Sequence, residues 1–135
     1  MQEALPIRNT AALADSQTSM DGEGPLRIRT VESSEILILD SGLRVRLLGV
    51  RENPARSAEA CEFLRRITAD QSVFMKEDKQ KLSNSGEPMV YLYLEDGRFI
   101  NALLVKYDLV DVDEDTPFRY RERFLKRQRD NRAQG

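Results

Sequence analysis

A predicted β-hairpin is the strongest constraint on the fold of this 135-residue chain. Residues 35–39 are mostly apolar, and residues 43–50 alternate between apolar and basic side chains before they end in an apolar run. Between them lies Asp40-Ser41-Gly42, a sequence typical of a turn. A turn sequence between two strand-like runs predicts a hairpin, so we expect the fold to contain a β-sheet.

The rest of the chain adds elements in an order typical of a mixed α/β (α+β) domain. We expect strands at 26–31, 35–39, 43–50, 72–76 and 89–94, a polar loop at 78–86, an extended segment at 109–112, and helices from Pro54 to near Asp70, at 101–107 and from about Phe118 towards Arg132. Asn53-Pro54 and Thr116-Pro117 each resemble a helix cap followed by proline at the first helical position. This order predicts a small five-stranded Greek-key β-barrel with about three helices.

The same pattern predicts the organisation of the chain. Residues 1–24 mix small and polar residues without periodicity and are expected to form a flexible leader. Residues 25–130 are expected to form one domain, and residues 131–135 a flexible tail. No apolar stretch approaches the ~18 residues that cross a bilayer, and the first residues lack the features of a secretory signal. We therefore expect a cytoplasmic protein without membrane association.

The composition excludes several kinds of chemistry. The chain has no His and a single Cys. Serine- or cysteine-histidine catalysis, imidazole metal ligands and zinc sites with paired thiolates are therefore excluded. Cys61 lies beside the apolar stripe of the first helix and is expected to be an inert thiol. Carboxylate, guanidinium, ammonium and hydroxyl groups remain for recognition of phosphate or of a hard metal ion.

Charge is separated along the chain, although the formal net charge is only −2. An acidic segment at 108–115 precedes a basic segment at 119–132. One interpretation is a solvated terminal helix that the acidic segment partly neutralises. The other is a basic arm that binds phosphates or an acidic partner.

Several motifs, in order, resemble those of the staphylococcal-nuclease-like (thermonuclease) domains. They are Arg46-Leu47-Leu48-Gly49-Val50, a helix with Ala60 and Phe63-Leu64, Val90-Tyr91-Leu92-Tyr93, and Asp96-Gly97 followed by Phe99-Ile100-Asn101 and Leu103-Leu104-Val105. The resemblance covers roughly residues 26–128. It implies an OB-fold barrel capped by helices. Active members of the family hydrolyse DNA and RNA with a calcium ion, two metal-binding Asp, a Glu base and two Arg.

This chain departs from that catalytic set at most positions. Arg46 matches the first family Arg, and Glu35 stands where one metal-binding Asp belongs. Arg51 replaces the second metal-binding Asp, and Ala55 replaces the Glu base. Glu87 replaces the second Arg. Since loss of one electrostatic donor alone costs roughly 10²–10³ in rate, these departures predict an inactive domain.

Two functions follow as hypotheses. The first is a non-catalytic module without a cofactor that binds single-stranded nucleic acid or a protein partner. Its candidate contacts are Arg27, Arg29, Arg44, Arg46, Arg119, Arg123, Lys126 and Arg127. The alternative is a divergent calcium-dependent nuclease that uses Arg46, Glu35 and Glu52, with Glu35 as the metal ligand. Tyr91 and Tyr93 alternate on a strand, and the pattern leaves open whether they lie in the core or at the surface.

Overall fold

The computed structural model describes residues 23–134, apart from the side chains of residues 23, 80 and 81, and has a mixed α+β fold. Its elements are β1 (Glu23–Leu26), β2 (Ile28–Val31), β3 (Ile36–Leu39), β4 (Arg44–Leu47), β5 (Val50–Glu52), α1 (Ser57–Thr68), β6 (Val73–Leu82), β7 (Pro88–Leu94), α2 (Ile100–Lys106), β8 (Val110–Val112) and α3 (Arg121–Gln134). The leader expected at 1–24 lies outside the described residues, except for its last two residues, which belong to β1.

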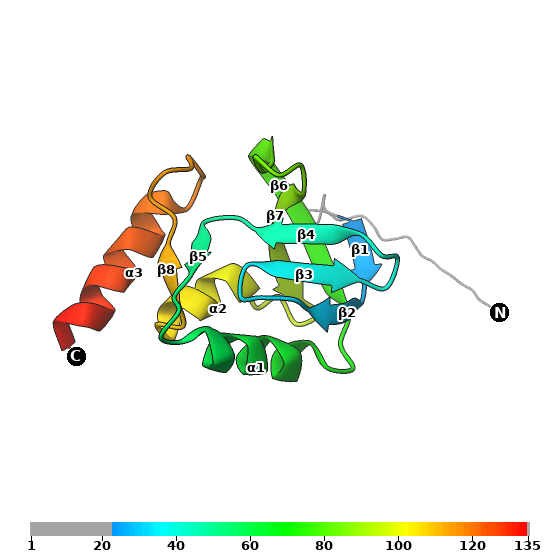
Figure 1. The fold of residues 1–135 in the computed structure, drawn as a ribbon, viewed down its shortest axis with the longest axis horizontal. Coiled ribbons are helices and arrows are strands. Elements are labelled where there is room, and N and C mark those ends of the chain that lie inside the picture. Colours follow the sequence, from blue (N-terminus) through cyan, green and yellow to red (C-terminus); the bar gives the residue numbers. More distant parts are fainter. Residues whose placement is uncertain (1–22, 135) are drawn as a thin grey trace.

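A six-stranded sheet in the order β1-β6-β7-β4-β3-β2 forms the centre of the fold (Figure 1). Neighbouring strands are antiparallel except β4 and β7, which are parallel. β5 and β8 form a separate antiparallel pair. Among the described residues no ladder joins β1 to β2, so the sheet is not closed into a barrel. The expected mixed α+β class and three helices are confirmed, whereas the described residues form eight strands in place of the five expected ones.

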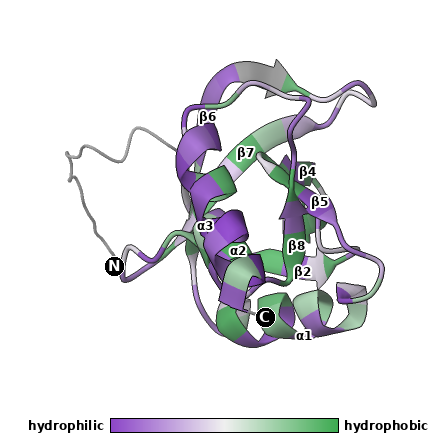
Figure 2. Ribbon diagram, turned by 90° about the vertical axis from the view of Figure 1, so that its left-hand side faces the viewer, coloured by the Kyte–Doolittle hydropathy of each residue, from purple (hydrophilic) through white to green (hydrophobic). Residues whose placement is uncertain are grey.

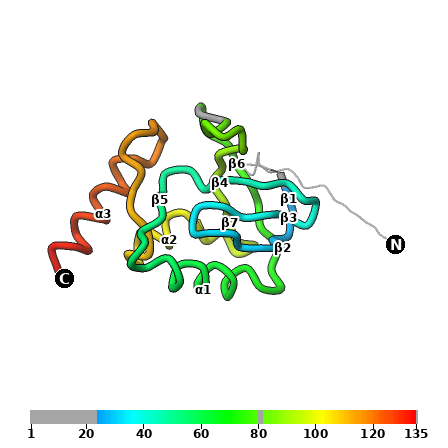
Figure 3. Tube along the Cα trace, viewed as in Figure 1, coloured from blue at the N-terminus to red at the C-terminus, as the bar shows by residue number. Residues whose placement is uncertain are grey.

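Two expected strands are divided because their halves have different partners. The strand expected at 26–31 is divided at Arg27. Leu26 ends β1, which pairs with β6, and residues 28–31 form β2, which pairs with β3. The strand expected at 43–50 separates into β4 and β5 at Leu48-Gly49. Gly49 has a φ of +92°, a left-handed conformation that glycine adopts without a side-chain penalty. The chain therefore leaves the sheet after β4, pairs with β8 through β5 and then enters α1 (Figure 3).

The predicted hairpin is present as β3 and β4. Its register aligns Ile36 with Arg46 and Ile38 with Arg44. Val45 and Leu47 are buried, whereas Arg44 and Arg46 point to the opposite face, because successive side chains of a strand alternate between faces. The hairpin thus places two guanidinium groups close together on the solvated side of the sheet.

The helices cover the sheet unequally. α1 buries Ala60 and Leu64, and α2 buries Ile100 and Leu104. α3 buries only Phe124, and most of its residues are hydrophilic (Figure 2). α3 is therefore held by the burial of Phe124 and by polar contacts of Gln128, Asn131 and Arg132, and most of its other side chains are exposed.

Several expected ends of helices and strands are wrong, because side-chain hydrogen bonds and strand pairing extend or shorten the elements relative to the local sequence pattern. α1 begins at Ser57 without a side-chain cap, since Asn53 forms a turn with Ala55 upstream of the helix. α3 begins at Arg121 and continues to Gln134, so residues 131–134 are helical. The polar loop expected at 78–86 is strand up to Leu82, because β6 remains paired with β7 as far as that residue.

Candidate functional site

A cleft of about 260 Å³ is lined by Glu35, Arg46 and Arg51, three of the residues that the sequence motifs single out. The end of β4, the start of β5, the β6–β7 loop and the segment after β8 form its walls. The lining includes Glu35, Arg46, Arg51, Ser83, Asn84, Ser85, Asp113 and Thr116. The structure therefore brings Glu35 and Arg46 together, as the resemblance implies.

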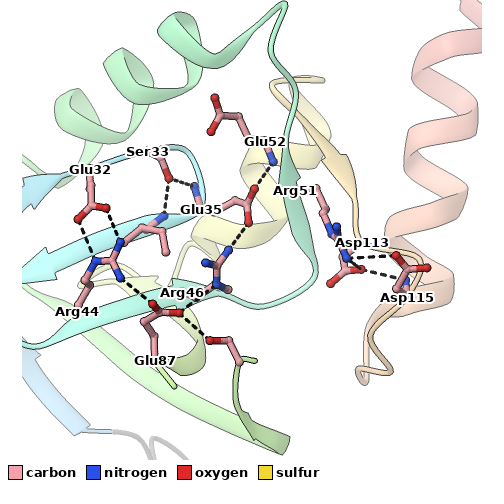
Figure 4. Close-up of polar contacts among 12 residues, drawn as sticks. Glu32, Ser33, Glu35, Arg44, Arg46, Arg51, Glu52, Glu87, Asp113 and Asp115 are labelled. Atoms are coloured by element: carbon pink, nitrogen blue, oxygen red, sulfur yellow. Dashed lines mark hydrogen bonds and ion pairs between the residues drawn. The ribbon is translucent and has the colours of Figure 1, made fainter. Parts of the chain in front are cut away.

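Arg46 is held between two carboxylates (Figure 4). Its Nη1 donates to Glu35 Oε1 at 2.5 Å, and its Nε donates to Glu87 Oε1 at 3.4 Å. The side chain is 27% exposed, so the pairs are partly shielded from solvent. Acidic groups of the same chain thus engage two of the five N–H donors of this guanidinium.

Glu87 is buried at the edge of this cleft and joins the two arginines of the hairpin. Besides Arg46, it accepts hydrogen bonds from Ser83 Oγ at 2.6 Å and from Arg44 Nη1 at 2.7 Å. The Ser83 hydrogen bond and the positive charges of Arg46 and Arg44 lower the pKa of Glu87 below its usual value. The charge reversal noted in the sequence therefore has a structural role, because Glu87 is the counter-ion of both guanidinium groups.

Arg44 extends the same set of contacts to the rim. Its Nε and Nη2 donate to the two carboxylate oxygens of Glu32 at 3.0 and 2.5 Å. We call Glu32, Glu35, Arg44, Arg46 and Glu87 the cleft network. The cleft network contains three carboxylates and two guanidinium groups, so its formal charge is −1.

Glu35 is positioned by its own loop and by β5. Ser33 Oγ accepts hydrogen bonds from the backbone N–H groups of Glu35 and Ile36, each at 3.1 Å. Glu35 Oε2 accepts the backbone N–H of Glu52 at 2.7 Å. The carboxylate of Glu52 is exposed, so Glu52 contacts Glu35 through its main chain and not as a second acid of a metal site. Within residues 23–134 no group of three or more acidic or thiol side chains is arranged to hold a metal ion.

Arg51 is also paired. Its Nη2 lies 3.2 Å from Asp113 Oδ1 and 3.2 Å from Asp115 Oδ2. Burial raises the pKa of Asp113, but hydrogen bonds from Thr116 and Asp115 and the charge of Arg51 outweigh it, so the pKa is lowered overall. The acidic segment thus neutralises Arg51, the cation that the resemblance aligns with a metal ligand. Another part of that segment, Asp108 and Asp111, pairs with Arg132 of α3 and partly neutralises the basic helix.

A second hollow, of about 480 Å³, lies between α2 and α3, and we call it the α2–α3 groove. Apolar side chains, among them Phe99, Ala102 and Phe124, form part of its surface. Its charged lining residues are Arg98, Lys106, Arg123, Lys126, Arg127 and Asp130. Five cations and one carboxylate therefore surround an apolar and aromatic surface.

The cations of the α2–α3 groove differ in their partners. Arg98 pairs with Asp96 and Lys126 with Asp130, in exposed ion pairs of 2.9 and 3.0 Å. The guanidinium of Arg123 lies 5.9 Å from the centre of the Phe99 ring and 5.7 Å from that of Tyr120. In the part of the chain that the structure describes, Lys106, Arg123 and Arg127 form no ion pair.

The structure divides the predicted basic contacts into separate surfaces. Arg123, Lys126 and Arg127 line the α2–α3 groove. Arg44 and Arg46 belong to the cleft network. Arg27 and Arg29 lie with Arg65 beside another hollow, of about 440 Å³, between β2 and α1. Arg119 is exposed, and its backbone N–H donates to Asp78, which also accepts the Tyr91 hydroxyl.

Sequence reasoning missed two cations of the α2–α3 groove. Arg98 occupies the variable position of the Asp96-Gly97-x-Phe99 motif, and Lys106 ends α2. Their positions beside α3 depend on packing between segments far apart in the chain. Tyr91 lies in the core, and Tyr93 is half-buried with its ring stacked on Phe99 at 4.7 Å. Burial and the hydrogen bond to Asp78 raise the pKa of Tyr91.

Comparison of the sequence with models of protein families and with curated proteins gives no match. Among the described helices, none has both the length and the apolar character that crossing a membrane requires.

Proposed function

We propose that this chain is a non-catalytic domain of the staphylococcal-nuclease-like type that binds single-stranded nucleic acid or a protein partner. The motif order supports this likeness, and so does the strand order. Only Arg27 separates β1 from β2, which stand at the two ends of the sheet order. If residues 23–31 are counted as one bent strand, five strands each have two neighbours, as an OB-fold barrel requires.

The double engagement of Arg46 by Glu35 and Glu87 is the observation that carries the non-catalytic proposal. Guanidinium groups assist phosphodiester hydrolysis when they are free to contact the equatorial oxygens of the transition state. Here a phosphate would have to displace two carboxylates from Arg46. It would also enter a cleft whose acidic groups outnumber its cations, since the cleft network has a formal charge of −1 and Arg51 is paired with two aspartates.

A nuclease assay with metal titration tests this proposal. We expect no cleavage of single-stranded DNA or RNA above a buffer control in the presence of calcium or magnesium, and no heat when calcium is titrated into the protein. A catalytically active thermonuclease serves as the positive control. Metal-dependent cleavage that is lost in both Arg46→Ala and Glu35→Ala would overturn the proposal and support the divergent nuclease instead.

A further inference from the structure

Positive charge without a carboxylate partner is concentrated away from the cleft. The cleft network is formally negative, whereas the lining of the α2–α3 groove has five cations and one acid. Three of these cations, Lys106, Arg123 and Arg127, form no ion pair with the residues that the structure describes. An anionic ligand therefore has stronger electrostatic attraction to this groove than to the cleft.

We propose that the α2–α3 groove binds single-stranded nucleic acid, with the cations on the phosphates and a base against the apolar and aromatic surface. This inference rests on the proposed function and gives it a location and a ligand class. The volume of about 480 Å³ lies within the range of sites for small organic ligands, so one nucleotide unit fits in such a space.

The aromatic surface favours a nucleic acid over a purely acidic ligand. Proteins that bind single strands combine a basic groove with flat groups on which bases stack. Phe99 is half-buried in the groove, and the Arg123 guanidinium lies over both Phe99 and Tyr120. These rings position the planar guanidinium beside the apolar surface, where it can contact a base or a phosphate.

The remaining cations are also accessible to phosphate. The pairs Arg98–Asp96 and Lys126–Asp130 are exposed, with side-chain exposures between 49% and 71%. Exposed ion pairs contribute only about 0–1 kcal/mol, so a phosphate can replace the carboxylate at little cost. In contrast, Glu87 of the cleft is buried and accepts hydrogen bonds from three side chains.

Fluorescence anisotropy with oligo-dT and oligo-U of about twelve nucleotides tests the proposal, because site sizes of single-strand binding folds are of that order. We expect affinity to fall steeply with salt. The variant Lys106→Gln/Arg127→Gln should bind about tenfold more weakly at low salt, and the slope of log K against log salt should become shallower by about 1.4, since two phosphate contacts are lost.

Arg56→Gln/Arg66→Gln is the matched control. It removes the same charge at Arg56, which directly precedes α1, and at exposed Arg66 of α1, neither of which lines the α2–α3 groove. We expect it to change affinity by less than about twofold. Arg123→Lys keeps the charge but removes the planar group, and it should weaken binding while the salt slope stays the same. Circular dichroism melting of each variant establishes that it is folded.

Three results would overturn the proposal: no binding of either oligonucleotide, equal losses in the groove variant and in the control, or equal competition by poly-glutamate of the same charge. The last result would indicate an acidic protein segment as the ligand. Cleavage of the oligonucleotide would contradict the non-catalytic function, whereas a selective effect of Lys106→Gln/Arg127→Gln would still locate binding in the groove. The two proposals therefore fail in distinguishable ways.

Discussion

The guanidinium of Arg46 and the carboxylate of Glu35 form an ion pair of 2.5 Å across the hairpin that joins β3 to β4. The register that aligns Ile36 with Arg46 creates this contact, because it brings the residue before β3 next to the end of β4. Glu87 occupies another side of the same guanidinium. Two carboxylates therefore compete with any phosphate that approaches Arg46.

Removal of these carboxylate charges is expected to open the cleft to phosphate. In Glu35→Gln/Glu87→Gln, Arg46 loses both anionic partners, and the formal charge of the cleft network changes from −1 to +1. Titration with inorganic phosphate should then shift the NMR resonance of the Arg46 side-chain Nε–H with a Kd at least about tenfold lower than in the wild type. The control Glu59→Gln/Glu62→Gln changes the net charge equally on exposed positions of α1. An Arg46 resonance that responds equally in the wild type would show that the carboxylates do not block the site.

Stability is expected to fall in acid. The folded-state pKa values of Glu87 and Asp113 are lowered, by hydrogen bonds and by neighbouring arginines. A lowered folded pKa adds stability above the unfolded values, about 4.3 for Glu and 3.9 for Asp, and this stability is lost as pH falls through the folded pKa. Thermal melting from neutral pH down to pH ~3 should therefore show a Tm that decreases mainly below about pH 4.3.

Glu87→Gln identifies the Glu87 contribution to this pH dependence. The variant should be less stable than the wild type at neutral pH and should lose less stability on acidification, because it has no carboxylate to protonate. Glu52→Gln, which alters an exposed side chain, serves as the control and should follow the wild-type curve. Parallel curves for Glu87→Gln and the wild type would contradict a role of Glu87 in acid sensitivity.

Asn101 is expected to be essential for stability. Its side chain is fully buried, its Nδ2 donates to the carbonyl oxygens of Leu48 and Val90, and its Oδ1 accepts the N–H of Leu92. Asn101→Ala leaves these buried backbone groups without the amide and should cost about 2–4 kcal/mol in urea unfolding. Asn131→Ala removes one half-buried hydrogen bond, to Val105, and should cost only about 1 kcal/mol. Similar costs for the two variants would contradict the special role of Asn101.

Local sequence patterns predicted the elements that depend on local interactions. The β3–β4 hairpin and the apolar face of α1 follow from side-chain alternation, helical spacing and a turn sequence, whereas the resemblance alone associated Glu35 with Arg46. The division of 43–50 into β4 and β5 was not predicted, because it depends on pairing with β8, about sixty residues further along the chain. Local patterns contain little information about such partners.

The charge pairs of the site were predicted less well than the charges themselves. Arg51 and Glu87 were recognised as reversals of the expected pattern, but their partners are distant in sequence, as in Arg51–Asp113 and Arg46–Glu87. Arg98 and Lys106 had no local feature that associates them with α3. Only the packing of α2 against α3 brings these cations into one groove.

Gly49→Ala is expected to destabilise the fold at the point where β4 ends and β5 begins. The φ of Gly49 is +92°, and a Cβ at this residue would lie 2.6 Å from the ring of Phe118. Backbone strain and the clash together should cost about 3–5 kcal/mol in urea unfolding. Gly97→Ala is the matched control, because Gly97 has a φ of +91° but no atom within 4 Å of a Cβ. That variant measures the backbone strain alone and should cost about 1–2 kcal/mol.

In Gly49→Ala/Phe118→Ala the ring is removed, so the cost of the double substitution should be smaller than the sum of the costs of the two single substitutions. Additive costs, or equal costs for Gly49→Ala and Gly97→Ala, would show that contact with Phe118 is not what requires glycine at this position.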